Sequence, residues 1–114
     1  MTTMSFMVLY PPPADVDQFE RDYQAHLELL HKKLGIPSDE RPYTVTKMLD
    51  GPTGPATFYQ LFSMDFADSD QLHEVLSSSA MQQVAADANR ISTGGAPVVL
   101  VGQPEVMASA QGGQ

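Results

Sequence analysis

The sequence predicts one α+β domain in which four strands and two helical regions follow the order β-α-β-β-α-β. Four short runs are rich in the apolar, β-branched and aromatic residues that favour strands, and they span Met4–Tyr10, Tyr43–Leu49, Thr57–Phe66 and Val98–Val101. Amphipathic helical patterns lie between the first and second runs and between the third and fourth. The length of 114 residues suits a single domain. We place that domain at residues 1–103 and expect residues 104–114 to form a flexible C-terminal tail.

The first strand and the first helix have clear boundaries. Three consecutive prolines follow Tyr10 and cannot continue a strand ladder. Asp15 or Asp17 can then cap a helix, and Gly35 can end it. Between these caps, apolar side chains recur at steps of three and four and form one stripe, made of Val16, Phe19, Tyr23, Leu27, Leu30 and Leu34.

The second and third strands are expected to form a hairpin. The segment between them, residues 50–55, is dense in Gly, Pro and Asp, which favour turns. Alternation along the third strand places Phe58, Gln60, Phe62 and Met64 on one face and Tyr59, Leu61, Ser63 and Asp65 on the other. Both faces carry large apolar groups, so we expect helices to cover one face and a partner to cover the other.

The second helical region has a break in its apolar pattern. Asp68 can cap its start with Gln71 at the third helical position. The stripe then shifts in phase around the three serines at 77–79, where Ser79 and Gln82 have the spacing of a second capping box. This pattern predicts either two consecutive helices or one helix bent at the serines.

The predicted order is that of the split βαβ, or ferredoxin-like, fold. We expect an antiparallel four-stranded sheet with helices on one face only. The other face would expose Phe, Tyr, Met and Val side chains, and an apolar patch of that size marks an interaction surface. Two copies can cover these faces by closing into a barrel, so the sequence predicts a homodimeric α+β barrel.

Composition excludes several functional classes. The chain has no cysteine, so it has neither disulfides nor thiolate metal sites. Its formal charge of −8 disfavours nucleic-acid binding, and no apolar run is long enough to cross a membrane. We find no metal-ligand spacing, no phosphate-binding glycine loop and no nucleophile elbow. We therefore expect a cytoplasmic protein that uses no cofactor and no metal.

Two parts of the sequence resemble a known family. The second helical region contains Ser77–Asn89, followed by Gly94–Gly102, and the first helix carries an aromatic-then-histidine pattern in Phe19, Tyr23 and His26. This combination resembles the EthD family, named for ethyl tert-butyl ether degradation, within the dimeric α+β barrel proteins, over most of residues 4–103. The resemblance implies small-molecule binding between sheet and helices and a part in xenobiotic degradation. Relatives in the barrel superfamily include cofactor-free monooxygenases, lactone isomerases and haem-degrading or chlorite-processing enzymes.

His26 is the first candidate for a catalytic residue, with Tyr23 beside it. An imidazole in a half-buried position can act as a general acid or base; the alternative is a structural histidine at the helix–sheet boundary. His31 and His73 do not share a helical face with it, and we expect His73 to be exposed. We interpret Asp87 and Asn89 as residues of a helix end. Aromatic residues that could line a ligand cavity, or simply pack in the core or dimer interface, are Tyr10, Tyr43, Tyr59, Phe19 and Phe62.

Three functions are compatible with this sequence. The first is an EthD-like small-molecule-binding protein that could be a cofactor-independent enzyme, oxygenase-like or isomerase-like, in the catabolism of hydrophobic organic compounds. The second is a non-catalytic accessory or carrier protein that binds a hydrophobic product or partner. The third is a structural dimer module without a pocket. The sequence leaves open whether the protein is an enzyme at all.

Overall fold

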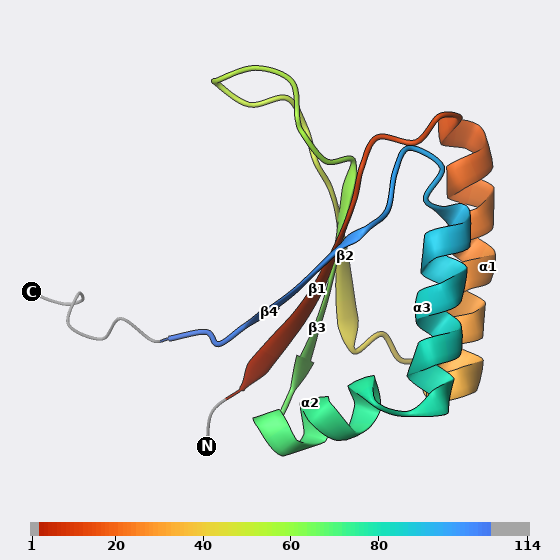
Figure 1. Ribbon diagram of the computed structural model, residues 1–114, viewed down its shortest axis with the longest axis vertical. Coiled ribbons are helices and arrows are strands. Elements are labelled where there is room, and N and C mark those ends of the chain that lie inside the picture. Colours follow the sequence, from red (N-terminus) through yellow and green to blue (C-terminus); the bar gives the residue numbers. More distant parts are fainter. Residues whose placement is uncertain (1–2, 106–114) are drawn as a thin grey trace, which may run out of the picture.

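A computed structural model describes residues 3–105 and contains the predicted order of elements (Figure 1). The four strands and three helices are β1 (Met4–Tyr10), α1 (Val16–Leu34), β2 (Tyr43–Lys47), β3 (Gln60–Phe66), α2 (Ser69–Leu76), α3 (Ser79–Ile91) and β4 (Val98–Gly102). The second helical region is therefore two helices and not one bent helix. The predicted tail at residues 104–114 lies outside the described residues from position 106 onward. No helix in residues 3–105 has the length and apolarity needed to cross a membrane.

The sheet is antiparallel, with the strand order β2-β3-β1-β4. β1 lies between β3 and β4, and its Val8 pairs with Phe62 on one side and with Val99 on the other. α1 and α3 lie side by side on one face of the sheet, and the short α2 lies at one end (Figure 1). This arrangement is the ferredoxin-like layering that the sequence predicts.

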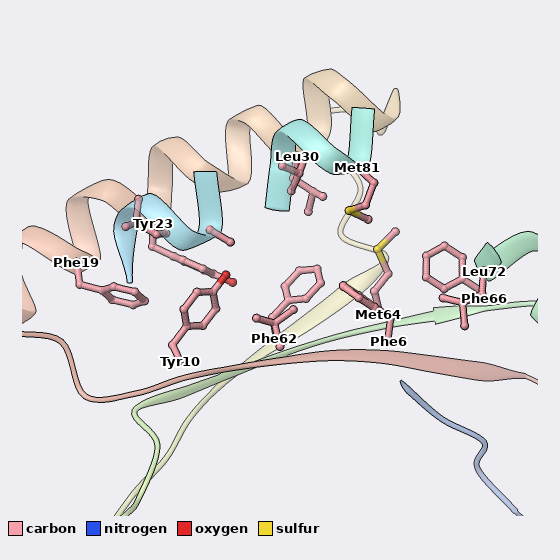
Figure 2. Close-up of a cluster of buried hydrophobic side chains, with 14 residues drawn as sticks. Phe6, Tyr10, Phe19, Tyr23, Leu30, Phe62, Met64, Phe66, Leu72 and Met81 are labelled. Atoms are coloured by element: carbon pink, nitrogen blue, oxygen red, sulfur yellow. The ribbon is translucent and has the colours of Figure 1, made fainter. Parts of the chain in front are cut away.

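The core lies between the sheet and the two long helices. β1 and β3 alternate buried and half-buried residues, and their buried side chains face α1 and α3. Tyr10, Phe19 and Tyr23 pack against one another with ring centroids 5.4–5.6 Å apart (Figure 2). Phe6 and Phe62 form an edge-to-face pair further along the sheet. The helical stripe predicted for α1 therefore packs onto the aromatic face of the sheet from Phe19 to Leu34. Its first predicted member, Val16, is 47% exposed, because it lies at the first position of the helix, before the stripe reaches the core.

The helix boundaries follow local hydrogen bonds. The Asp15 side chain accepts a hydrogen bond from the Gln18 N–H at the start of α1, and Gly35 ends this helix with a left-handed φ of 69°. Asp68 caps α2 in the predicted way. The predicted cap of α3 is one residue wrong: Ser78, not Ser79, accepts the hydrogen bond from the Met81 N–H. Adjacent serines offer the same chemistry, so composition alone could not distinguish them.

The hairpin departs from the predicted strand ends. β2 stops at Lys47 and β3 begins at Gln60, so the connection is longer than residues 50–55. Leu49, predicted in a strand, is 83% exposed within this connection. Tyr59 was predicted on the face of Leu61, but its ring packs edge-to-face on Phe19 of α1, on the side that Gln60 also faces. The chain bends at Tyr59 before β3 starts, so strand alternation does not extend to it.

The second face of the sheet carries no helix. Met7, Leu9 and Leu61 are half-buried there, and Val98 and Leu100 of β4 are exposed. We call this surface, formed by these five side chains, the open face. β4 is also poorly covered on its helix side, where Val99 is 56% exposed, because α1 and α3 lie over the other strands.

Gly94 joins two turns at one end of the domain. A Cβ atom at this position would lie 1.8 Å from the carbonyl oxygen of Pro12, and the Ala14 N–H donates a hydrogen bond to Thr93 Oγ1 at 3.1 Å.

We expect Gly94→Ala to lower the free energy of unfolding by about 2 kcal/mol, since one of the two turns must move away. Urea unfolding would measure this loss. Gly51→Ala is the control, because a Cβ there meets no atom within 4 Å; equal effects of the two changes would contradict the prediction.

Candidate functional site

A cavity of about 210 Å³ lies between the sheet and the helices. Its walls come from β1, β3 and β4 on the sheet side and from α1, the last residue of α2 and α3 on the helix side. Most of its lining is apolar, and the polar groups that reach it come from Tyr10, His26, Gln82 and Asn89. A cavity smaller than the roughly 300–1,000 Å³ of common ligand pockets suits a small compound.

His26 occupies the α1 wall of this cavity and is only 5% exposed. Its Nδ1 lies 2.8 Å from Asp87 Oδ2 on α3. Asp87 in turn accepts hydrogen bonds through Oδ1 from Arg90, one turn further along α3. Nε2 makes no hydrogen bond to any residue in the described part of the chain. A carboxylate that is hydrogen-bonded to Nδ1 keeps the imidazole proton on that nitrogen, and the lone pair of Nε2 then remains available.

The surroundings of this pair move both pKa values below their ordinary ranges. Burial lowers the pKa of His26, and although the hydrogen bond to Asp87 opposes this effect, the net shift is downward. Burial would raise the pKa of Asp87, but the hydrogen bonds from His26 and Arg90 outweigh it and lower this pKa. At neutral pH the pair therefore consists of a neutral imidazole and a carboxylate, which is the state required of a general base.

Tyr10 and Tyr23 bring two hydroxyl groups to the same region. Their ring centroids are 5.6 Å apart, and Figure 2 shows both rings in the space between the sheet and the helices. Tyr10 lines the cavity, and the Tyr23 ring packs against His26 with ring centroids 5.6 Å apart. Burial raises the pKa of both phenols, and the negative charge of Asp87 adds to the effect on Tyr10. Both hydroxyl groups therefore stay protonated.

A polar cluster lies behind Tyr23, away from the cavity. Lys47 Nζ donates hydrogen bonds to Gln60 Oε1 and to Glu20, and the Tyr59 hydroxyl donates to Glu20. The hydrogen bond to Glu20 raises the pKa of Tyr59 to about 12. Gln60 lies near the Tyr23 hydroxyl and opposes the rise in its pKa. Within residues 3–105, however, neither this hydroxyl nor Gln60 Nε2 has a hydrogen-bond partner of acceptable geometry.

Tyr43 belongs to a different part of the molecule. Its hydroxyl donates a hydrogen bond to His31 Nε2 at 2.7 Å, and His31 Nδ1 donates to the carbonyl oxygen of Pro37 at 3.1 Å. These residues border a more open groove of about 450 Å³ on the outer side of α1. Both nitrogens of His31 thus form hydrogen bonds that connect the end of α1 to Tyr43 of β2 and to Pro37, and neither nitrogen is free to bind a ligand.

The structure separates the residues that the sequence suggested for the site. His26, Tyr10 and Phe62 line the cavity, with Tyr23 packed behind His26. Phe19 lies in the core, Tyr59 belongs to the cluster around Glu20, and Tyr43 borders the outer groove. No set of three or more His, Asp or Glu side chains within residues 3–105 is placed to hold a metal ion.

Asp87 is the site residue that the sequence did not reveal. It lies 61 positions from His26 in the sequence. It is a polar residue beside Ala88, which belongs to the apolar stripe, and it therefore resembles an ordinary surface residue of a helix. The one signal available was its place inside Ser77–Asn89, the stretch that resembles the EthD family. Pairing across α1 and α3 depends on how the two helices align, which neither helix shows alone.

Comparisons with known proteins identify the fold. No family model matches the chain, and no curated protein does. An EthD family protein from Bacillus halodurans C-125 superposes with a TM-score of 0.75 and 23% identity, over 92% of this chain and 100% of the other. An EthD-like protein from Ralstonia eutropha JMP134 gives a TM-score of 0.65 and 19% identity, over 97% and 99%. A dimeric ferredoxin-like protein of unknown function from Jannaschia sp. CCS1 gives 0.60 and 16%, over 91% and 99%.

These similarities define the class of fold to which the chain belongs. It has the ferredoxin-like α+β fold seen in EthD family structures, which confirms the predicted fold class. The fold therefore supports the resemblance to the EthD family, which was based on Phe19, Tyr23, His26 and the second helical region. Identities of this size carry no activity from one protein to another.

Proposed function

We propose that this protein is a homodimeric, EthD-like small-molecule-binding protein of the cytoplasm that acts as a cofactor-independent enzyme on a small hydrophobic organic compound. The observation that carries this proposal is His26, which lines the wall of an apolar cavity and is hydrogen-bonded to Asp87 behind it. A role in the catabolism of such compounds, including xenobiotics, follows from the resemblance to the EthD family. The proposed reaction uses no cofactor and no metal.

The proposed chemistry is proton transfer. Asp87 holds the proton of His26 on Nδ1, so Nε2 accepts a proton from a bound compound and returns it in a later step. The lowered pKa of His26 keeps the imidazole neutral at pH 7, and the burial of its side chain limits contact with water that would compete for the base. Tyr23 supports the ring from one side.

The homodimer is supported by the open face. Met7, Leu9, Leu61, Val98 and Leu100 form an apolar surface that no element of this chain covers within residues 3–105. A second copy that covers this surface would remove it from water, at about 25 cal/mol for each Å² of apolar area. The Jannaschia protein of the same fold is dimeric.

Screening for ligands tests the proposal. Wild-type protein is combined with phenolic, quinone and ether compounds, thermal unfolding is monitored, and the mixtures are examined by mass spectrometry. We expect at least one compound to stabilise the protein and to be converted. His26→Gln should slow conversion at least a hundredfold without abolishing binding, whereas the exposed His73→Gln should match wild type.

Other outcomes of this screen contradict the catalytic proposal. Stabilisation without conversion would favour the carrier protein, for which the apolar cavity alone is sufficient. Conversion that survives His26→Gln unchanged would remove His26 from the base role. A protein that no compound stabilises would be a structural module.

A further inference from the structure

The polar cluster behind Tyr23 fixes the orientation of the Gln60 amide. Gln60 is completely buried, and Lys47 donates to its Oε1. Because a lysine ammonium only donates, it fixes the orientation of the amide and turns Nε2 inward. An inward amide N–H donates, and the hydroxyl oxygen of Tyr23 is the group next to it.

Two buried tyrosines lie between this amide and the cavity. Within residues 3–105 neither Gln60 Nε2 nor the Tyr23 hydroxyl has a hydrogen-bond partner, and the rings of Tyr23 and Tyr10 pack edge to face with centroids 5.6 Å apart. Tyr10 itself lines the cavity, so its hydroxyl is the tyrosine donor within reach of a ligand. Tyr10 is 2% exposed, and its hydroxyl makes no hydrogen bond to another residue in the described part of the chain. A ligand with an acceptor oxygen would gain a hydrogen bond from this hydroxyl.

The cavity therefore contains a donor and a base on different walls. Tyr10 comes from β1 and His26 from α1, and apolar side chains such as Phe6, Val8 and Met81 line the space around them. The described residues that line the cavity include no Asp, Glu, Lys or Arg, so none of them can pair with an ionic ligand. The matching ligand is small, neutral and largely apolar, and it carries one acceptor oxygen.

We propose that the ligand is a small carbonyl compound whose oxygen accepts a hydrogen bond from Tyr10 while His26 removes a proton from the carbon next to the carbonyl. This inference rests on the proposed function and names its substrate class. The C–H bond breaks, its proton goes to His26 Nε2, and its electron pair moves to the carbonyl oxygen as an enolate. The proton returns to the same carbon, or to a conjugated carbon if the compound has a double bond, so the reaction needs no oxidant or cofactor. Tyr10 stabilises the charge that develops on oxygen.

Binding of matched six-membered rings tests the role of Tyr10. Cyclohexanone and methylcyclohexane have similar size, but only the ketone has an acceptor oxygen. We expect wild-type protein to bind cyclohexanone about tenfold more tightly than Tyr10→Phe does, since one hydrogen bond is lost. Methylcyclohexane should bind both proteins equally, which also shows that the variant is folded. Equal cyclohexanone binding by the two proteins, or no binding by wild type, would overturn the inference.

Proton exchange tests the base and separates the two proposals. In D₂O, wild type should exchange the protons next to the carbonyl of cyclohexanone faster than buffer does, as seen by NMR. His26→Gln should abolish this enhancement, and Tyr10→Phe should reduce it at least tenfold. Exchange that is lost in His26→Gln and unchanged in Tyr10→Phe would overturn the carbonyl inference while the proposed function stands. Tyr10-dependent binding without exchange in wild type would contradict base catalysis on this class and leave only the binding role of Tyr10.

Discussion

Asp87→Ala is expected to lower the free energy of unfolding by about 2–3 kcal/mol, because it leaves the Nδ1–H of a buried imidazole without an acceptor. His26 and Asp87 are both largely buried, with side-chain exposures of 6% and 17%, so solvent compensates little for the lost hydrogen bond. Chemical denaturation at pH 7 measures the loss. Arg90→Ala is the control, since it removes the other partner of Asp87 from a side chain that is 60% exposed, and it should cost less than 1 kcal/mol. Equal losses would contradict the importance of the His26 hydrogen bond.

The same pair makes stability depend on pH in a predictable direction. The folded pKa of His26 lies below its ordinary value of 6.5, so the unfolded chain binds more protons and wild type loses stability as the pH falls below about 6.5. Asp87 acts in the same direction below its ordinary value of 3.8, because its folded pKa is also lowered. Without Asp87 the pKa of His26 should fall further, and the ring titration followed by NMR in Asp87→Ala would measure this shift. An upward shift would contradict the hydrogen bond.

Leu100→Glu is expected to convert the proposed dimer into a monomer. Leu100 lies on the open face opposite Met7, and a carboxylate buried against a second copy would have no partner. An unpaired buried charge costs about 3–5 kcal/mol, which weakens association at least a hundredfold. Light scattering after size exclusion measures the mass at a series of concentrations.

Val16→Glu is the matched control for this change. Val16 is also an exposed apolar residue, at 47%, but it begins α1, where an acidic residue is favoured by the helix dipole. We expect this variant to assemble as wild type does. A Leu100→Glu protein that remained dimeric would show that the two copies meet through another surface.

Local rules predicted most of the fold. The prolines after Tyr10 marked the end of β1, and Asp15 and Gly35 marked the two ends of α1. These boundaries could be predicted because each capping or breaking residue lies next to the element that it limits. The ends of β2 and β3 could not be predicted in this way. Leu49 has the composition of a strand residue, but β3 begins only at Gln60 and provides no partner for it.

The site was predictable only in part, for a related reason. His26 could be located because its spacing from Phe19 and Tyr23 belongs to one helix. Its partner Asp87 lies on another helix, and the inward orientation of Gln60 depends on Lys47 in a neighbouring strand. Contacts between elements depend on register and helix alignment, which local periodicity does not determine.

The close approach of Gly94 to Pro12 restricts how a compound can reach His26. The turn after α3 and the turn before α1 are held together there, so sheet and helices cannot separate at that end. The cavity instead borders solvent between α3 and β4, where Val99 is 56% exposed and Gln82 and Asn89 are also exposed. We therefore expect compounds to enter and leave along the edge between α3 and β4, away from the turns that meet at Gly94.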